Sequence, residues 1–327
     1  MILAGDVGGT KTTLAIFDPR QDELRVPVVE HSYPSREFGS LEAILDRFIT
    51  EHEPSVERAG FGIAGPVVNR HVETPNLPWK ITVEALSDRL GIPGHRIGMA
   101  NDLVANAMGV EALRPEDVRT IHAGEADKHG NSALLSAGTG CGMAIILHTG
   151  EGVTPVATEG GHIDFAPRNA LEIGLLEHMR NRFGRVSYER VLSGPGLHNI
   201  YGYLRDTGFA PEPDWLAAEI ANGDPGAAIS KAALARSSDL ASQTLEMFVS
   251  IYGAMAGNLA LMVLATRGVY IGGGIAPKIL RKLEEGSFIE AFRQKGRFTP
   301  MMERIPVHVI LDAKAALYGA ARVAASL

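Results

Sequence analysis

Three glycine-rich segments each follow an apolar segment, at residues 5–10, 138–142 and 272–274. Glycine has no Cβ, so the backbone of such a segment can turn tightly and lie close to a ligand. Consecutive backbone N–H groups in a turn form a concavity that accepts anionic oxygens. One such segment is equally well explained as an ordinary hairpin turn. Three of them, two with similar sequences, indicate a protein that binds a nucleotide through its phosphates.

The first segment nearly matches the P-loop pattern G-x-x-x-x-G-K-[ST], which binds phosphates. Gly5 and Lys11 fit the pattern, but Thr10 stands where its second glycine should be. A P-loop also leads into a helix, whereas the TTLAIFD that follows is rich in β-branched and apolar residues and predicts a strand. We therefore expect a phosphate-binding hairpin rather than a P-loop. Lys11 either reaches a phosphate or is a solvated residue at a strand end.

Asp6 is expected at the end of the first strand, beside the amides of this turn. A lone carboxylate there would repel a phosphate unless a cation lay between them. Mg²⁺ that travels with phosphates takes few protein ligands and keeps several waters. Asp6 is therefore a candidate magnesium partner, either directly or through water. The alternative is that Asp6 hydrogen-bonds its own backbone in an Asx turn.

Asn101 and Asp102 separate a strand-like segment, 97–100, from a helical one that extends to about Leu113. Proteins with α/β sheets bind ligands at the carboxyl ends of the strands, which makes Asp102 a candidate general base. Phosphoryl transfer passes through a loose transition state, so the attacking hydroxyl needs orientation more than strong activation. An ordinary aspartate, ionised at pH 7, can supply that. Either residue is also an ordinary helix N-cap.

A second group of polar side chains suits a polyhydroxylated ligand. Glu159 and His162 flank two glycines, which allow a sharp turn that aims both side chains at one point. Glu189 stands in a helical start that we expect to run into a turn at 194–196, and Asn76 lies in a proline-rich loop. Carboxylates accept hydrogen bonds from hydroxyls, and histidine accepts or donates them. A metal site is the rival interpretation, although no second histidine stands at helical ligand spacing. Each residue taken singly also fits ordinary surface or turn chemistry.

The elements that must position these residues alternate between strands and helices, which predicts an α/β fold. Strands are expected within 1–18 (two strands around a turn), at 59–64 and 97–100, within 133–147 (again two strands around a turn), and at 268–271 and 307–311. Helices are expected at 41–52, 83–90, 102–113, 171–183, 215–222, 227–265 and 313–325, the last capped by Asp312. LAGDVGGTKTTLAIFD resembles LLSAGTGCGMAIILH further along the chain, which indicates duplication of a whole domain.

Composition limits the classes of function. The chain has 327 residues, which suggests about two domains, and it is 45% hydrophobic and 21% charged, as in soluble globular proteins. A net charge of −7 disfavours nucleic acid or an anionic membrane as the main partner. The single cysteine, Cys141, excludes an intramolecular disulfide and a cysteine-based zinc site, and favours a reducing compartment. The N-terminus lacks a signal-peptide pattern, and the most apolar segment, 254–265, is shorter than the about 20 residues of a membrane span. We therefore expect a cytoplasmic protein.

Several motifs in register resemble those of the bacterial glucokinases, ATP-dependent enzymes of the hexokinase–actin–Hsp70 superfamily. They are GDVGGTK at 5–11, AND at 100–102, GTG at 138–140, EGGHIDF at 159–165, ERVLSGPGL at 189–197 and GGGIAPK at 272–278. The resemblance covers nearly the whole chain. It implies a two-domain, actin-like ATPase (ribonuclease H-like) α/β fold with an interdomain cleft, a small domain of residues 1–112 plus 307–327, a large domain of residues 113–306, and a homodimer. The related ROK sugar kinases carry a cysteine-rich zinc motif after the sugar-binding histidine. The sequence after His162 is IDFAPRN, so ROK membership is not expected, although the TPNLPW loop resembles theirs.

The resemblance also implies roles for individual residues in the transfer of the γ-phosphoryl group of MgATP to the 6-hydroxyl of D-glucose. Asp102 is the implied base. The implied sugar ligands are Asn76, Asn101, Asp102, Glu159, His162 and Glu189. The implied ATP-binding residues are Gly5, Asp6, Val7, Gly8, Gly9, Thr10, Lys11, Gly138, Thr139 and Gly140, with Gly272, Gly273 and Gly274 on the adenosine side and Asp6 near Mg²⁺.

Three alternatives remain at this stage. The first is a kinase for another hexose, such as fructose, mannose or an N-acetylhexosamine, because the contacts of one hydroxyl decide between them. The second is a sugar-responsive regulator on the same fold; it would need a DNA-binding module, and the first expected strand begins at residue 2. The third is a chaperone or cytoskeletal ATPase of the superfamily, which would lack the sugar-binding residues.

Overall fold

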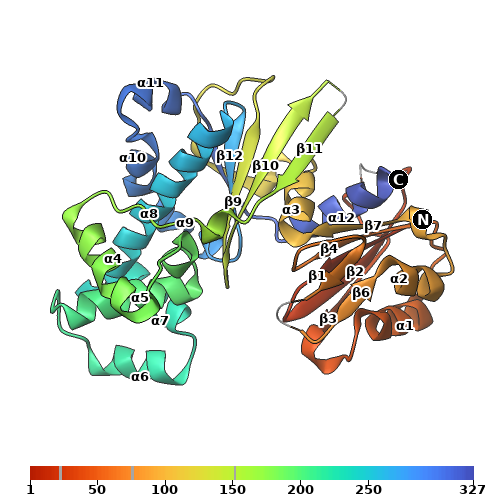
Figure 1. Ribbon diagram of the computed structural model, residues 1–327, viewed down its shortest axis with the longest axis horizontal. Helices are drawn as coiled ribbons and strands as arrows, with labels where there is room; N and C mark the ends of the chain where they lie inside the picture. Colours follow the sequence, from red (N-terminus) through yellow and green to blue (C-terminus); the bar gives the residue numbers. More distant parts are fainter. Residues whose placement is uncertain (22–23, 75–76, 151) are drawn as a thin grey trace. The chain divides into compact units, whose positions relative to one another are not determined.

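The computed structural model describes residues 1–21, 24–74, 77–150 and 152–327 of the chain. They form two compact units. Unit 1 comprises Met1–Asp117, Thr149–Ala157 and Asp312–Leu327, and unit 2 comprises Val118–His148 and Thr158–Leu311. Figure 1 shows the elements of both units coloured along the chain.

Unit 1 is built on a five-stranded sheet with the strand order β3-β2-β1-β4-β7. The strands are β1 (Ile2–Val7), β2 (Lys11–Phe17), β3 (Val29–Pro34), β4 (Arg58–Ile63) and β7 (Ile97–Asn101). The first three are antiparallel neighbours, and β4 and β7 continue the sheet in parallel with β1. Strand β3 was not expected, because its VEHSYP sequence is polar and mostly exposed.

Helices cover both faces of this sheet (Figure 1). They are α1 (Leu41–His52), α2 (Val83–Leu90), α3 (Asp102–Val110) and α12 (Ala315–Ala325). Successive side chains of a strand point to opposite faces. Accordingly, Leu3 and Val7 of β1 pack in the core formed with α1 and α2, and Ile2 and Ala4 pack in the core formed with α12. The amphipathic spacing that predicted α1 and α2 therefore matches the face that each helix buries.

Helices α3 and α12 pack at very short range. A Cβ at Gly319 would overlap the backbone carbonyl of Ala105, and one at Gly109 would overlap the carbonyl of Ala315. This close approach fixes α12 against α3, whose first residue is the candidate base Asp102. The expected cap of the last helix is wrong: Asp312 is not its N-cap residue, and its side chain instead accepts hydrogen bonds from the Lys314 amide (2.8 Å) and the Tyr318 hydroxyl (2.9 Å).

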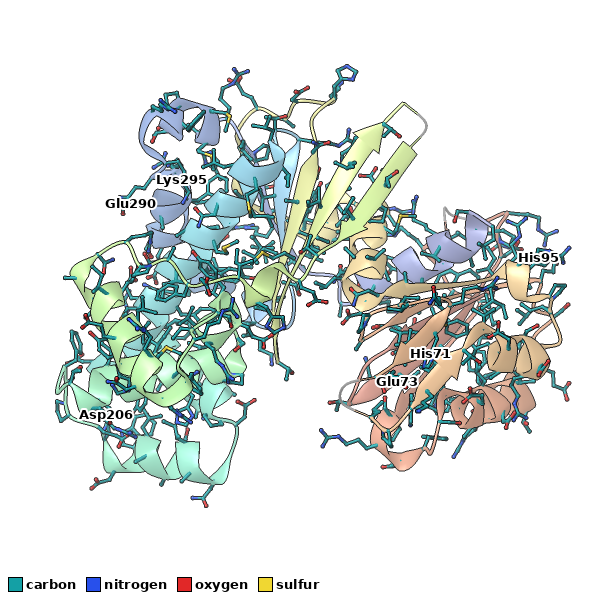
Figure 2. All side chains as sticks on the ribbon, viewed as in Figure 1. His71, Glu73, His95, Asp206, Glu290 and Lys295 are labelled. Carbon is teal, nitrogen blue, oxygen red and sulfur yellow. The ribbon has the colours of Figure 1, made fainter. Side chains whose placement is uncertain are left out.

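A small hairpin of β5 (His71–Glu73) and β6 (Lys80–Thr82) also belongs to unit 1 and was not expected. Figure 2 labels His71 and Glu73 on it. Glu73 lies 3.8 Å from the His71 imidazole and 3.3 Å from the Lys80 ammonium. These are exposed pairs, which contribute little stability.

The second sheet has the order β11-β10-β9-β12-β13-β8. Its strands are β8 (Val118–His122), β9 (Ser132–Ala137), β10 (Cys141–Thr149), β11 (Gly152–Ala157), β12 (Gly268–Gly272) and β13 (Val307–Ile310). Strands β9 and β10 form an antiparallel hairpin and β12 runs parallel to β9, as β1, β2 and β4 do in the first sheet. The two similar glycine segments thus occupy equivalent hairpins, which supports the inferred duplication. Strand β13, which begins at Val307, pairs with β12 in this sheet.

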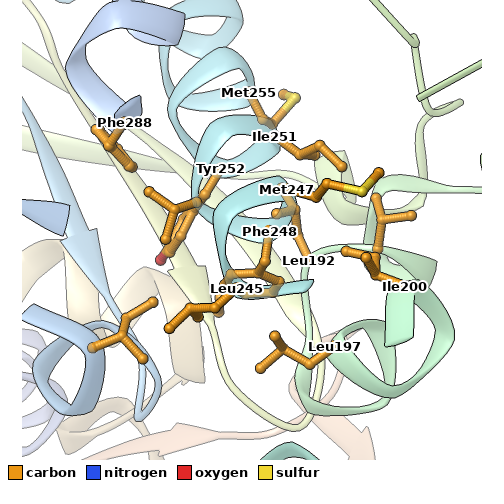
Figure 3. Packing of buried hydrophobic residues seen from close by; sticks show 14 of the residues in the cluster. Leu192, Leu197, Ile200, Leu245, Met247, Phe248, Ile251, Tyr252, Met255 and Phe288 are labelled. Carbon is orange, nitrogen blue, oxygen red and sulfur yellow. The ribbon is translucent and has the colours of Figure 1, made fainter. Parts of the chain in front are cut away.

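The helices of unit 2 surround a large apolar core. They include α4 (Ala170–Phe183), α5 (Gly194–Asp206), α6 (Asp214–Asn222), α7 (Pro225–Leu234), α8 (Asp239–Val263), α9 (Leu280–Leu283), α10 (Ser287–Arg293) and α11 (Thr299–Met302). Figure 3 shows Phe248, Ile251 and Tyr252 of α8 in this core with Leu197 and Phe288. Among the described residues, α8 is the one helix long and apolar enough to cross a membrane. Because 67% of its apolar window is buried inside the structure, it is a core helix.

Two helix boundaries of unit 2 depend on local backbone geometry. The long helical region expected at 227–265 consists of two helices, α7 and α8, because Arg236 adopts a left-handed conformation with φ of 54° and Ser238 caps α8 by accepting from the Ala241 amide at 3.2 Å. The expected turn at 194–196 is instead the first turn of α5. Ser193 caps it by accepting from the Gly196 amide at 3.0 Å, and a proline stands in the first turn, where its missing N–H costs no hydrogen bond.

Candidate active site

The β1–β2 turn of unit 1 is a hairpin, as expected, and leads into a strand rather than a helix. The Gly8 amide donates to the Lys11 carbonyl at 3.0 Å. Buried Ser35 holds the turn from one side: its amide donates to the Thr10 carbonyl at 3.0 Å and its hydroxyl donates to the Gly8 carbonyl at 2.7 Å. Ser35 was not singled out from the sequence, since a lone serine in a polar segment carries no signal.

Gly5 and Val7 lie within β1 rather than in the turn. Gly5 pairs with Leu14 and is buried, and a Cβ there would crowd the Phe61 ring. The Val7 side chain is part of the apolar core. Packing therefore accounts for both residue types, and the turn itself is formed by Gly8, Gly9 and Thr10.

Two carboxyl groups of unit 1 interact beside this hairpin. Asp6 is the fifth residue of β1, and Asp102 is the first residue of α3. Burial and then the negative charge of Asp102 raise the pKa of Asp6 to about 6, and the positive charge of Lys11 opposes the shift. Asp6 and Asp102 are therefore close enough to repel each other, which favours either a shared proton or a cation.

The start of α3 orients Asp102. Asn101 is the N-cap residue: its Oδ1 accepts from the Leu103 amide at 2.9 Å, and its Nδ2 donates to the Gly65 carbonyl at 3.1 Å. Asp102 Oδ1 also accepts from the Leu103 amide at 2.9 Å. The capping interpretation of Asn101 is confirmed, and its side chain ties the α3 start to the loop after β4.

In unit 2, the equivalent turn joins β9 and β10. The Gly138 amide donates to the Gly140 carbonyl at 2.8 Å, and the Gly194 amide, at the start of α5, donates to the Gly138 carbonyl at 2.8 Å. Glu189 supports the turn from another side, because its Oε2 accepts from the Cys141 amide at 3.0 Å. Glu189, a predicted sugar ligand, thus also supports the predicted phosphate-binding turn at Gly138–Gly140 through this hydrogen bond.

The third glycine segment packs directly on the second. Gly272 ends β12, and Gly273 has a φ of 82°, which favours glycine. A Cβ at Gly273 would overlap the Ala137 carbonyl, and that same carbonyl accepts from the Ile275 amide at 3.2 Å. The structure therefore brings the two glycine turns of unit 2 together.

A cavity of about 560 Å³ opens beside these two turns. It is lined by Gly138, Thr139, Gly194, Pro195, Leu197, His198, Asp224, Pro225, Gly226, Ala227, Ser230, Gly274, Ile275, Lys278 and Ile279. The first residues of α5 and α7 thus lie on its wall, and N-terminal amides of helices favour anions. The α7 contribution was not expected from the sequence, although an aspartate before a proline, as at Asp224 and Pro225, is a typical helix start.

Glu159 and His162 lie together in unit 2, with 4.0 Å between Glu159 Oε2 and His162 Nε2. Both are exposed, at 76% and 58% of their side-chain surface. Glu159 is the N-cap residue and His162 the last residue of a short 3-10 helix, Gly160–His162. A Cβ at Gly161 would overlap the carbonyl of Cys141, so this glycine lets the turn lie directly on β10. Glu159 and His162 are therefore exposed on a turn that lies against Cys141, the residue whose amide donates to Glu189.

Arg185 fixes this turn and was not anticipated. Its guanidinium donates to the His162 carbonyl at 2.6 Å and pairs with Asp164 at 2.7 Å. Cys141 is buried below the turn. Burial and the charge of Glu189 raise the pKa of the Cys141 thiol to about 12, so it stays protonated at neutral pH. A thiol in that state is neither a nucleophile nor a metal ligand. Asn76, the remaining predicted sugar ligand, lies outside the described residues.

The two sheets share the order of five strands, to which β8 adds a sixth in the second sheet, and each bears a glycine turn between its two central antiparallel strands; this is the actin-like ATPase fold in its two-domain form. The family model of the glucokinases matches residues 3–327. A glucokinase from Trichormus variabilis is 42% identical over 100% of this chain and 99% of its own length. The crystal structure of a glucokinase from an Antarctic psychrotroph is 30% identical, with a TM-score of 0.84 over 100% of this chain and 99% of its own. A ROK family glucokinase from Streptomyces griseus, solved in complex with glucose and AMPPNP, shares the fold at 23% identity, with a TM-score of 0.68 over 100% and 99%.

The chain belongs to the glucokinase family. It is accordingly an ATP-dependent hexose kinase, and its family membership assigns it the phosphorylation of glucose.

Proposed function

We propose that Asp102 is the general base that takes the proton from the 6-hydroxyl of D-glucose as this oxygen attacks the γ-phosphorus of ATP. The observation that carries this proposal is the placement of Asp102 at the start of α3, in electrostatic contact with Asp6 beside the β1–β2 hairpin. A base in this reaction has mainly to orient the hydroxyl and accept its proton late. The Asn101 cap and the packing of α12 on α3 hold Asp102 for that task.

Asp6 is the residue that would hold Mg²⁺, directly or through water. Its fit rests on the chemistry of the site: a half-buried carboxyl group that another carboxylate repels offers hard oxygen donors, which this ion prefers. Bound with ATP, Mg²⁺ would neutralise phosphate charge. Gly8, Gly9, Thr10 and Lys11 would then meet the phosphates with N–H groups and an ammonium.

The cavity of unit 2 suits a nucleotide. Leu197, Ile275 and Ile279 offer apolar contacts for an adenine ring, and the N-terminal turns of α5 and α7 offer amides for charged or hydroxyl oxygens. Gly138, Thr139 and Gly140 would approach the phosphates. The Streptomyces griseus glucokinase was solved in complex with AMPPNP, so a protein of this fold binds a nucleotide.

Glu159, His162 and Glu189 would bind the sugar hydroxyls, with Asn101 and Asn76. Glu159 and His162 are exposed on a turn that Arg185 fixes. Their side chains lie 4.0 Å apart, too far for a hydrogen bond to each other, so both are available to a ligand. Glu189 would act through the carboxylate oxygen that does not face the Cys141 amide. Glucose in the Streptomyces griseus complex supports a sugar site on this fold.

We further propose that units 1 and 2 correspond to the small and large domains of the fold, and that the enzyme acts in the cytoplasm as a homodimer. The protonated Cys141 and the net charge of −7 suit a reducing, soluble environment. Light scattering coupled to size-exclusion chromatography measures the oligomeric state.

The test is ADP release by the purified chain with MgATP, without sugar and with glucose, fructose, mannose or N-acetylglucosamine in turn. We expect strong release with glucose alone. Release with another hexose would leave the proposed base and nucleotide site unchanged, and would mean that the contacts of one hydroxyl select that other sugar. No release that depends on sugar would overturn the proposal.

A further inference from the structure

A cluster of two imidazoles and a carboxylate lies on unit 1, outside every group assigned above. His31 belongs to β3, and Glu51 and His52 end α1. One ligand atom from each residue lies within 4.8 Å of the other two. Residues 20 positions apart in sequence thus converge at one edge of the first sheet, and two histidines with a carboxylate are a common donor set for transition metals.

His52 carries a nitrogen that the fold leaves unsatisfied. Its Nε2 is buried and has no hydrogen-bond partner among the described residues. The ring is held edge-on against Phe48, with 4.8 Å between centroids, and faces His31 at 6.2 Å. Nε2 lies 4.0 Å from Glu51 Oε2. A buried polar atom without a partner is unfavourable, so a bound ion at this point would remove a penalty that the free protein bears.

The charges around the cluster also suit a cation. Glu51 accepts hydrogen bonds from Arg47 (2.8 Å) and from the Tyr33 hydroxyl (3.1 Å). Arg47 donates to Oε1, and the Tyr33 hydroxyl donates to Oε2, which is also the oxygen that lies 4.0 Å from His52 Nε2. The cluster stands at the C-terminal end of α1, where the helix dipole is negative. In the part of the chain that the structure describes, Arg47 is the one arginine or lysine in an ion pair with the cluster.

We propose that His31, Glu51 and His52 form a binding site for a divalent transition-metal ion of the Zn²⁺ class, with water completing the coordination. Imidazole ligands select such ions over Mg²⁺, so the site is distinct from the ATP-associated metal near Asp6. A metal bound there would cross-link β3 to the end of α1. Because β3 runs directly into Ser35, which holds the phosphate hairpin, the ion would stiffen the support of that turn.

Calorimetric titration of ZnCl₂ into the full-length, chelator-treated protein, without nucleotide, tests the proposal. We expect one site per chain, a rise in Tm with Zn²⁺, and a d–d absorption band with Co²⁺. His31→Ala and Glu51→Gln should each weaken Zn²⁺ binding at least about tenfold, since even outer-shell changes have effects of that size. Their activity without added Zn²⁺ should equal that of the wild type, which shows that they fold.

Two further variants sharpen the test. His95 is an exposed histidine of the same unit, outside the cluster (Figure 2), so His95→Ala should leave Zn²⁺ affinity unchanged. Arg47→Gln removes the opposing charge and should tighten binding. The proposal is overturned if the wild type binds no Zn²⁺, if His31→Ala binds as tightly as the wild type, or if His95→Ala weakens binding equally.

Discussion

Replacing Asp6 by asparagine should stabilise the free protein while impairing its use of MgATP. The pKa of Asp6 is raised from 3.8 to about 6, first by burial and then by Asp102. At 1.36 kcal/mol per pKa unit, ionising Asp6 in the folded state costs about 3 kcal/mol relative to the unfolded chain. Asparagine has the same shape and no charge, so Asp6→Asn should regain up to about 3 kcal/mol at pH 7.5.

The pH dependence gives the sign of the effect. A carboxyl group with a raised pKa contributes no penalty below its unfolded pKa, near 4, because it is protonated in both states. The wild type loses stability as the pH rises from about 4 to 6, and the loss is complete above that range. The stability difference between Asp6→Asn and the wild type should therefore be small at pH 4 and largest above pH 6.5.

Urea unfolding followed by circular dichroism at pH 4, 5, 6 and 7.5 measures this difference, and a coupled ADP assay measures activity. Asp18→Asn is a matched control of opposite sign. The pKa of the wild-type Asp18 carboxyl group is lowered to about 2, chiefly by the hydrogen bond from Arg20. The stability that this carboxylate contributes is therefore present above pH 4 and is lost as the pH falls through 2. Asp18→Asn should therefore destabilise the protein at neutral pH. The reasoning is refuted if Asp6→Asn is less stable than the wild type at pH 7.5, or if its advantage does not change with pH.

Other substitutions test the two halves of the site in unit 2. Gly273→Ala should cost about 2 to 3 kcal/mol of stability and raise the KM for ATP, because the φ of Gly273 is 82° and a Cβ would overlap the Ala137 carbonyl. Urea unfolding measures the stability and ATP saturation curves measure the KM. An unchanged KM would mean that the third glycine turn is not part of the nucleotide site. Glu159→Ala and His162→Ala should each raise the glucose Kd about tenfold, the effect of losing one or two hydrogen bonds to a ligand. Asp164 is a neighbour on the same turn, and Asp164→Asn should leave the glucose Kd unchanged. If calorimetry gives the same rise in Kd for all three variants, only the stability of the turn affects glucose binding.

Local patterns predicted the elements of the first sheet where periodicity and burial agree. Leu41, Ile44, Leu45 and Phe48 stand at helical spacing, and all four are buried in the α1 face, so the helix was predicted with its observed limits. The strand after Thr10 also followed from residue type, which separated the hairpin from a P-loop. Strand β3 was not predicted, because its backbone hydrogen bonds to β2 hold it in the sheet although its sequence has no alternation of apolar and polar residues.

Helix boundaries in unit 2 depended on local backbone geometry that periodicity does not report. The break before α8 rests on the left-handed Arg236 and the Ser238 cap, and the apolar pattern continues on both sides of it. The start of α5 at Gly194 looks like a turn because Gly-Pro-Gly is typical of turns. The Ser193 cap followed by a proline was the signal that could have identified it.

The site was predictable as a set of residue types but not as a set of contacts. The sequence pointed to Glu189 as a sugar ligand, and only the fold showed that it holds the Cys141 amide. Ser35 and Arg185, which fix the two functional turns, act through single hydrogen bonds to backbone carbonyls. Such contacts depend on tertiary placement, because any serine or arginine nearby in space could make them.

The most direct test of the central claim compares turnover and glucose affinity in Asp102→Ala. A base that mainly orients and accepts a proton contributes about 10² to 10⁴ to the rate. We therefore predict a fall of that size in kcat for glucose-dependent ADP release, with the glucose Kd from calorimetry within about threefold of the wild type and an unchanged circular dichroism spectrum. Retained turnover, or a loss of glucose affinity that matches the loss of turnover, would contradict the assignment of Asp102 as the base.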